Sequence, residues 1–337
     1  MNSEFAAIES WTNTFRQFGP QPLTGIGDDC AVLDMSAQKQ LLVSSDSMLE
    51  GVHFDLAYFP LVHLGYKSVV AAVSDIYAMN GQPEYILVSI NVPTHWAPTR
   101  ILEIYDGIEH ACRVCSLTLV GGDTTLSKSG LGIHVTVLGK PGNGPVVFRA
   151  GANPTDLICV TADLGSAYAG FLLLEQEKEV LGQNPEATHK LDEYQFLVER
   201  FLKPEPTVSY LDVLHHAGVQ PTSMIDISDG LANEVNHLCK QSGTGAVIYL
   251  NKLPIDFKTI DYANEVQQPP ESFALYGGED YQLLFTVPLS SYEIVRKLDG
   301  ITVIGKMVDA SEGIHVADSQ GNLAELKPLG WDHFKNI

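Results

Sequence analysis

The sequence predicts a layered α/β fold with mixed sheets, divided into two domains. Segments with strand character and segments with helical periodicity alternate along the 337 residues, but they do not form regular βαβ units. This pattern argues against a doubly wound parallel sheet and for mixed α+β layers. Apolar residues make up 45% of the chain, which is enough for a sizeable core. A stretch rich in glycine and proline, 140–156, separates the halves, and we place the domains at 1–148 and 149–337.

In the first half, the most informative element is a helix expected at 66–79. Its apolar residues surround most of its circumference, which predicts a buried helix. Asp75 lies inside this helix, where a carboxylate is costly unless it has a partner. Further helices are expected at 3–18 and 98–115, and strands at 31–33, 40–47, 85–92, 117–120 and 131–138.

In the second half, a strand at 223–227 leads through Ser228-Asp229-Gly230 into a helix with Leu231, Val235 and Leu238 on one face. Gly243 is the expected C-cap of that helix. The other expected elements are strands at 157–161, 246–250 and 283–287 and helices at 166–175, 193–201 and 207–217, with a polar loop at 183–188.

Composition excludes several classes of protein. The formal net charge of −21 argues against a basic face for nucleic acid. The five cysteines are odd in number and scattered, so a disulfide framework is not expected, and the Cys112-x-x-Cys115 pair is interpreted as structural. The amino terminus lacks the pattern of a signal peptide, and no apolar run reaches about 18 residues. We therefore expect a cytoplasmic protein without a transmembrane helix.

Familiar catalytic motifs are missing from the chain. It contains no P-loop, no dinucleotide-binding G-x-G-x-x-G between a strand and a helix, and no set of protein-kinase motifs. It also contains no G-x-S-x-G nucleophile elbow and no H-E-x-x-H metal motif. These absences argue against most hydrolases and dehydrogenases.

Aspartates in glycine- or serine-rich turns beside apolar strands carry the chemistry instead. They are Asp28, Asp29, Asp46, Asp75, Asp123, Asp226 and Asp229, accompanied by the hydroxyls of Ser44, Ser45, Thr124 and Ser228. Oxygen ligands without partnered histidine or cysteine favour Mg²⁺, Mn²⁺ or Ca²⁺. Phosphates repel carboxylates, so a cation between them predicts phosphoryl transfer. Each aspartate alone has a simpler interpretation, because aspartate is common in turns and Asp229 fits a helix cap.

Longer motifs carry a family resemblance that runs from Gly25 to Phe334. They are G-I-G-D-D-C-A-V-L, S-S-D-S-M-L-E-G-V-H-F, Y-K-S-V-V-A-A-V-S-D-I-Y-A-M, V-G-G-D-T-T, I-D-I-S-D-G-L and G-G-E-D-Y-Q-L-L-F-T-V, in this order. The chain resembles the thiamine-monophosphate kinases, members of the superfamily that includes aminoimidazole ribonucleotide synthetase. G-I-G-D-D and D-I-S-D-G are marks of the superfamily, whereas the combination with G-V-H-F, G-G-E-D-Y and G-W-D-H-F is typical of the kinase.

The resemblance implies a homodimer whose N-terminal domains form a barrel, and ATP- and Mg²⁺-dependent phosphorylation of thiamine monophosphate to thiamine diphosphate. The implied metal ligands are Asp29, Ser44, Ser45, Asp46, Asp75, Asp123, Asp226 and Asp229. The implied ATP contacts are Gly122, Asp123, Arg149 and Ser228. The implied substrate contacts are His53, Glu279 and Trp331. Two positions depart from the family pattern: Ser45, where many relatives have threonine, and Trp331, where tyrosine or phenylalanine is more usual.

These residues also have simpler interpretations. His53 fits a surface histidine, Arg149 a solvated charge and Trp331 a hydrophobic anchor, while Glu279 fits an ordinary turn acid. For the reaction, the expected nucleophile is an oxygen of the substrate's own phosphate. Its second pKa is about 6, so it is mostly dianionic near pH 7. We therefore assign no general base and expect direct in-line transfer.

Two rival functions remain at this point. The first is another ATPase of the superfamily that acts on a different small substrate. Selenophosphate synthetase would require a reactive cysteine or selenocysteine in a glycine-rich N-terminal segment, which is missing here. The hydrogenase-maturation relative would end in cysteine, whereas this chain ends in Lys335-Asn336-Ile337. The second is a non-catalytic nucleotide-binding paralogue, which should have lost some of the aspartates.

Overall fold

The computed structural model describes residues 23–24, 28–36, 39–183 and 191–331. The helix expected at 3–18, residues 25–27 of the first aspartate loop and most of the loop expected at 183–188 lie outside the described residues. Within the described part of the chain, no helix is both long and apolar enough to cross a membrane.

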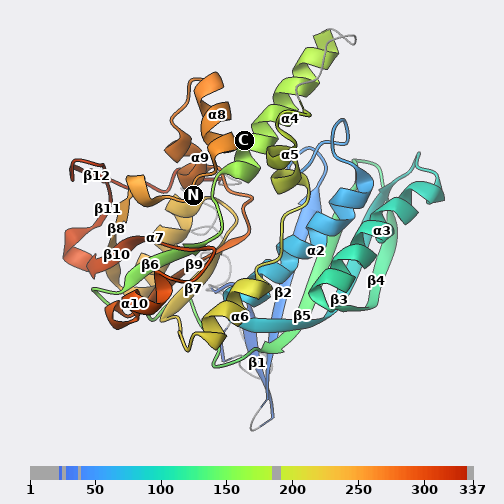
Figure 1. The fold of residues 1–337 in the computed structure, drawn as a ribbon. Helices are drawn as coiled ribbons and strands as arrows, with labels where there is room; N and C mark the ends of the chain where they lie inside the picture. The colour runs from blue at the N-terminus through green and yellow to red at the C-terminus, as the bar shows by residue number, and fades with distance from the viewer. Residues whose placement is uncertain (1–22, 25–27, 37–38, 184–190, 332–337) are drawn as a thin grey trace.

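The described strands form two sheets, one in each half of the chain (Figure 1). The first sheet has five strands in the order β1-β2-β5-β3-β4. Its neighbours are antiparallel except for β3 and β4, which are parallel. The strands are β1 (Ala31–Ser36), β2 (Lys39–Leu49), β3 (Gly81–Pro93), β4 (Thr118–Ser127) and β5 (Gly132–Pro141).

The second sheet has seven strands in the order β12-β11-β8-β10-β6-β9-β7. Only the pair β11 and β8 is parallel. The strands are β6 (Leu157–Thr161), β7 (Ser223–Ile227), β8 (Thr244–Tyr249), β9 (Gln282–Val287), β10 (Ile301–Asp309), β11 (Ile314–Ala317) and β12 (Leu323–Glu325). Both sheets are therefore mixed, as the irregular alternation of strands and helices predicts.

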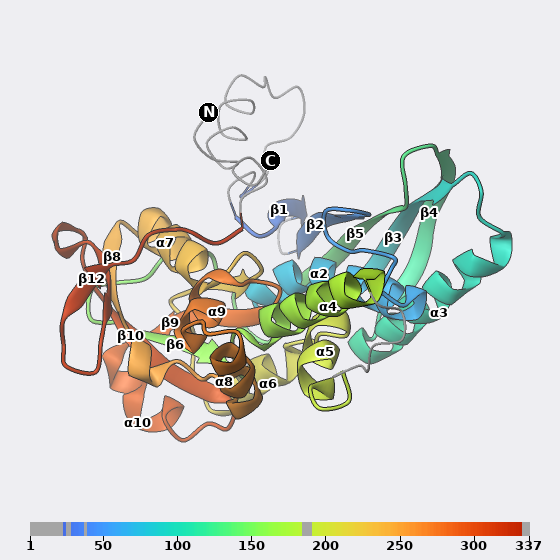
Figure 2. The same cartoon turned by 90° about the horizontal axis from the view of Figure 1, so that it is seen from above.

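The helices cover the sheets and fill the space between them (Figures 1 and 2). They are α2 (Leu61–Ala78), α3 (Pro98–Cys115), α4 (Ser166–Gln183), α5 (Gln195–Leu202), α6 (Val208–His216), α7 (Leu231–Ser242), α8 (Phe257–Glu265), α9 (Pro270–Tyr276) and α10 (Tyr292–Val295). Gly243 ends α7 in the left-handed region at φ 67°, which confirms the predicted C-cap.

Helix α2 is the central element of the molecule. It packs on β2, β3 and β5 of the first sheet and also contacts β7 of the second (Figure 2). Fifteen of its eighteen residues are buried, which confirms the expectation of a buried helix. The largest hydrophobic core cluster includes Val73 of α2, Val137 of the first sheet and Phe285 of the second, so the two halves share one core.

Strand β4 differs from its prediction. The expected strand ended at 120 and delivered Gly121-Gly122-Asp123 to a turn, but the strand continues to Ser127. The register of β4 against β3 shifts between Ile86 and Leu87. A Cβ on Gly122 would lie 1.8 Å from the Val88 carbonyl oxygen, so the glycines let the strand continue through this bulge.

Two glycines allow α2 and α3 to pack backbone against backbone. A Cβ on Gly65 would lie 2.0 Å from the carbonyl oxygen of Ile104, and a Cβ on Gly107 would lie 1.9 Å from that of Val62. We expect Gly107→Ala to force the helices apart and to lower the free energy of unfolding by about 1–3 kcal/mol, as overpacking does. Chemical denaturation measures this loss.

Gly182→Ala is the matched control, because nothing lies within 4 Å of a Cβ at this position in α4. The higher helix propensity of alanine should raise stability there by up to about 1 kcal/mol. Equal stabilities of the two variants would contradict the close packing of α2 and α3.

Candidate metal and substrate site

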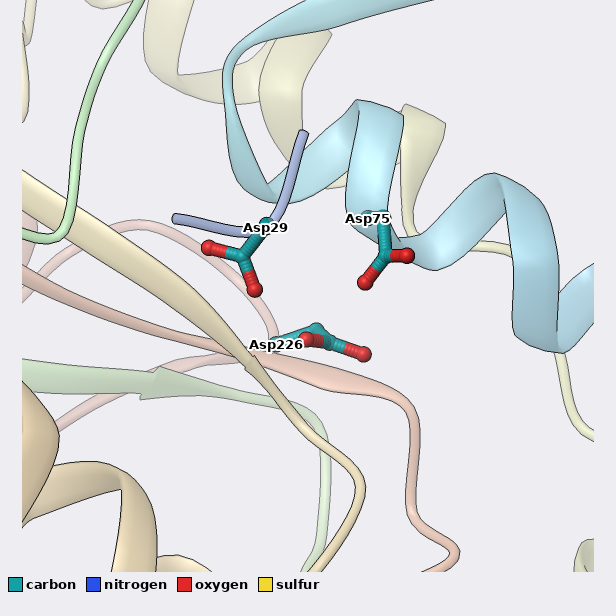
Figure 3. A group of neighbouring side chains, drawn as sticks. All are labelled: Asp29, Asp75 and Asp226. Carbon is teal, nitrogen blue, oxygen red and sulfur yellow. The ribbon is translucent and has the colours of Figure 1, made fainter. Parts of the chain in front are cut away.

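Three carboxylates that are distant in sequence meet between the two halves. Asp29 lies in the loop before β1, Asp75 on α2 and Asp226 on β7, and one oxygen from each lies within 4.8 Å of the others. Figure 3 shows the three side chains pointing toward one another. Asp29 and Asp226 are buried, with 8% and 5% of their surfaces exposed. Like charges at this separation repel one another, so other groups must hold them there.

Arg149 holds Asp29 in a bidentate ion pair. Its Nε donates to Asp29 Oδ2 at 3.0 Å, and its Nη2 donates to Asp29 Oδ1 at 2.5 Å. Asp28 lies beside the pair, with its Oδ1 4.0 Å from Arg149 Nε. Arg149 lies in the segment between β5 and β6 that connects the sheets, so one arginine fixes the loop before β1 against that segment.

Hydroxyl groups hold the other two carboxylates. Ser44 of β2 donates to Asp75 Oδ2, and Ser74 of α2 donates to Asp226 Oδ2 at 2.7 Å. Consecutive residues of α2 therefore contact both sheets. This geometry supplies the partners that the sequence argument requires for a carboxylate inside a buried helix.

The carboxylates are strongly perturbed. Burial and the charge of Asp29 raise the pKa of Asp226 to about 8. Burial and the charge of Asp226 raise the pKa of Asp75 well above its ordinary value, and burial raises that of Asp28 to about 6, with the charge of Asp29 adding to it. Without a cation, the cluster therefore retains protons near neutral pH.

The cluster opens into a cleft of about 560 Å³ between the halves. Asp46, Asp75, Asp226, Ser228 and Asp229 line its acidic end. The rest of the wall is largely aromatic and includes Tyr168, Phe171, Phe201, Tyr276, Tyr281 and Trp331. His53 and Glu279 also line the cleft, so the structure brings all three predicted substrate contacts together with the acids.

A constrained loop, 277–281, sits beside the strand that carries Asp226. Glu279 N–H donates to the Ser228 carbonyl at 2.8 Å, and a Cβ on Gly278 would lie 2.4 Å from that carbonyl oxygen. Gly278, Glu279 and Tyr281 all have positive φ, at 72°, 64° and 49°. Non-glycine residues in this region carry strain, which here places Glu279 at the cleft.

The aromatic wall at Trp331 is anchored by backbone contacts. Trp331 N–H donates to the Asp229 carbonyl at 3.0 Å. Asn233 accepts from Gly330 N–H and donates to the Trp331 carbonyl, both at 3.1 Å. A Cβ on Gly330 would lie 2.2 Å from the Asp229 carbonyl oxygen, so only glycine allows this approach.

Asp229 does not cap α7, contrary to the simpler interpretation of the sequence. The N-cap residue is Gly230, which has no side chain that could make a capping hydrogen bond. Asp229 lines the cleft instead, while its own N–H donates to Glu234 Oε1 at 3.0 Å. The chain around Asp229 is thus held by a buried glutamate of α7.

Three predicted positions lie apart from the cluster in this chain. Ser45 points to the other face of β2, because side chains alternate along a strand, and its hydroxyl contacts that of Thr136 at 3.1 Å. Gly122 and Asp123 lie on exposed β4. The pairing Asp46–Val135–Val88–Gly122 puts three strand spacings, about 14 Å, between Asp46 and Gly122. Their binding roles remain predictions.

Sequence reasoning missed the supporting residues. Asn233 and Glu234 carry no ligand-like motif, and Ser74 stands in one only as the neighbour of Asp75, yet each orients a site residue. The sequence did contain a signal against Ser45 as a metal ligand. Side chains alternate along a strand, so Ser45 lies on the face opposite to Ser44 and Asp46.

The donor set fits a hard divalent cation. Three carboxylates, with Ser44, Asp46 and Asp229 nearby, offer oxygen ligands only, and no described histidine or cysteine joins the cluster. Such ligands suit Mg²⁺, Mn²⁺ or Ca²⁺ and disfavour zinc or copper.

Comparison with known proteins identifies the class. Residues 27–140 match the family model of the N-terminal domain of AIR synthase related proteins. The thiamine-monophosphate kinase of Bacillus subtilis is 32% identical, over 92% of this chain and 93% of the relative, and that of Aquifex aeolicus is 34% identical, over 92% of each. The chain belongs to the thiamine-monophosphate kinase family. A solved structure of AaThiL complexed with AMPPCP and TMP superposes with a TM-score of 0.83, at 32% identity, over 98% of this chain and 97% of that one.

The perturbed carboxylates predict a pH dependence of stability. Between pH 6.5 and about 8 the folded, metal-free protein holds protons on Asp226 that the unfolded chain, with an ordinary pKa of 3.8, has released. Stability should therefore fall as the pH rises through this range. His237, whose pKa burial lowers to about 4, has the opposite effect, but only below pH 6.5.

Urea unfolding in EDTA at several pH values measures this slope. Mg²⁺ at 100 times its dissociation constant should add about 2.7 kcal/mol, most clearly at the upper end of the pH range, where protons compete least. Asp226→Asn should flatten the slope in EDTA. Rising stability of the metal-free wild type from pH 6.5 to 8 would contradict the repulsion that we assign to the cluster.

Proposed function

We propose that the protein transfers the γ-phosphoryl group of ATP to thiamine monophosphate, with Mg²⁺ as the metal cofactor. The observation that carries the proposal is one continuous cleft, with a carboxylate cluster at one end and an aromatic wall with His53 and Glu279 along the rest. Anionic phosphates can bind at the carboxylate end only if cations lie between the two sets of negative charges. The cationic rings of thiamine can bind at the aromatic end. The family to which the chain belongs supports the same reaction.

Asp29, Asp75 and Asp226 would hold Mg²⁺, together with the predicted ligands Ser44, Asp46 and Asp229. When bound, Mg²⁺ neutralises phosphate charge and aligns the reacting oxygens. The chain itself provides orientation. Arg149, Ser44 and Ser74 fix the carboxylates, and the aromatic residues of the cleft exclude water from the transfer.

Acid–base chemistry is not required of the protein. The acceptor is a phosphate oxygen that is already mostly deprotonated near pH 7. We propose direct in-line transfer without a phosphoenzyme.

Ser228 lines the cleft, in keeping with its predicted contact to ATP. Arg149 donates through Nε and Nη2 to Asp29, so its predicted contact to ATP would use the other edge of the guanidinium group.

We further propose a cytoplasmic homodimer, the compartment following from the use of ATP. The outer edge of β4 supports the dimer. Nine of its ten residues are exposed, and Leu119, Val120 and Leu126 have exposed fractions of 41%, 53% and 72%. An unpaired apolar edge strand is a template for pairing with another chain. Gly122 and Asp123 would then lie at this interface.

The reaction predicts consumption of ATP with thiamine monophosphate, and none with thiamine or with aminoimidazole precursors. Asp46→Asn should lower kcat at least about 100-fold, because loss of metal-mediated charge stabilisation costs several kcal/mol. Coupled assays of ADP release measure both effects.

Asp106→Asn, at an exposed position on α3, is the control and should retain full activity. Intact turnover in Asp46→Asn would refute the metal role of that residue. Turnover with thiamine but not with its monophosphate would refute the assigned acceptor.

The dimer proposal predicts that Leu126→Lys weakens self-association at least about tenfold, because a charge replaces apolar contact at the edge strand. Leu102→Lys is the control, since Leu102 is 63% exposed on α3 and is not part of the edge strand β4. Sedimentation velocity across a concentration series measures both variants. A wild type that stays monomeric at all concentrations would overturn the proposal.

A further inference from the structure

Lys67 is a buried cation that stands in the motif Y-K-S-V-V-A-A-V-S-D-I-Y-A-M but has no role in the proposed chemistry. It lies on α2, and none of its surface is exposed. Lysine is almost never fully buried unless its charge is paired. A role for the side chain must therefore be sought in what surrounds its ammonium group.

The ammonium group makes three close contacts with two residues of the second half of the chain, and the centroid of the Phe59 ring, from the first half, lies farther away at 5.6 Å. Lys67 Nζ lies 2.5 Å from Glu279 Oε2 and donates to the Phe201 carbonyl at 2.7 Å. It also lies 3.7 Å from the centroid of the Phe201 ring, a cation–π distance. In the described part of the chain, Glu279 is the acid that forms an ion pair with Lys67.

Glu279 is held by one oxygen only. Oε2 contacts Lys67 and also accepts from the Tyr281 hydroxyl at 3.3 Å. Among the described residues, no hydrogen bond engages Oε1. The Glu279 side chain is 27% exposed and lines the cleft. Because its backbone is fixed at φ 64° and its Oε2 is fixed by Lys67, Oε1 is left for a ligand.

We propose that Lys67 is a positioning residue that orients Glu279 for recognition of the substrate's cationic ring system. The buried ammonium fixes Oε2 and so gives the carboxylate of Glu279 a defined direction at the wall of the cleft. Phe201 has two roles. Its carbonyl and its ring hold the Lys67 ammonium group, and the residue also lines the cleft. This inference rests on thiamine monophosphate as the substrate, and it assigns recognition to a pair that bridges the two halves.

Steady-state kinetics of Lys67→Met, Glu279→Gln and the double variant test the proposal. Lys67→Met keeps a long unbranched side chain and removes its charge. We expect it to raise the KM for thiamine monophosphate at least tenfold, while the KM for ATP stays within about twofold and kcat within about threefold. Glu279→Gln should give a similar rise. The KM for thiamine monophosphate of the double variant should be no higher than that of the more impaired single variant, since the two residues act as one unit.

Lys178→Met is the matched control, because Lys178 forms a more exposed ion pair, with Asp55 at 2.7 Å. It should leave the KM for thiamine monophosphate unchanged. If Lys67→Met does not fold, Lys67→Gln, which retains a donor for the Phe201 carbonyl, provides the same comparison.

An unchanged KM for thiamine monophosphate in a folded Lys67 variant would overturn this inference but leave the proposed function intact. Equal rises in the KM for thiamine monophosphate and the KM for ATP would do the same. So would a rise in KM in the double variant that equals the product of the two single-variant rises. A wild type without turnover would instead overturn the proposed function, and this inference with it.

Discussion

Repulsion between Asp29, Asp75 and Asp226 is the constraint on which the rest of the structure depends. Three carboxylates within 4.8 Å are unfavourable in a folded chain, and burial makes them more so. The fold holds them with one arginine and two serine hydroxyls, drawn from both halves of the chain. Under the proposed function, the site would give up stability in the metal-free state and recover it when cations bind, which is a common relation between activity and stability.

Helix α2 satisfies this constraint because it serves both halves at once. Its apolar residues pack on the first sheet. Its polar residues face the second half or the carboxylate cluster: Lys67 pairs with Glu279, Ser74 donates to Asp226, and Asp75 belongs to the cluster itself. One rigid element therefore sets the position of the acidic end and, through Lys67, the position of Glu279 at the aromatic end. Sites on rigid helices and strands hold their geometry better than sites on loops.

Much of the site could be predicted from the sequence because motif aspartates follow turns and strand ends, where side chains converge. Asp75 was the strongest case, since a carboxylate in an apolar helix requires a partner. The supporting residues could not be predicted in this way. Lys67, Ser74 and Asn233 act through partners that are 134, 152 and 98 residues away, and only the packing of the two halves creates those contacts. The strand through Gly121-Gly122-Asp123 was missed because glycine normally indicates a turn, whereas here it allows a bulge.

The shared core has a consequence for how the molecule unfolds. Because Val73, Val137 and Phe285 belong to one hydrophobic cluster, neither half can separate without exposing apolar surface of α2. The two sheets should therefore melt together as one cooperative unit, and calorimetry should record a single transition. Local opening would then be confined to the periphery, such as the short hairpin of β11 and β12, whose exchange of amide hydrogens should be the fastest among the paired strands.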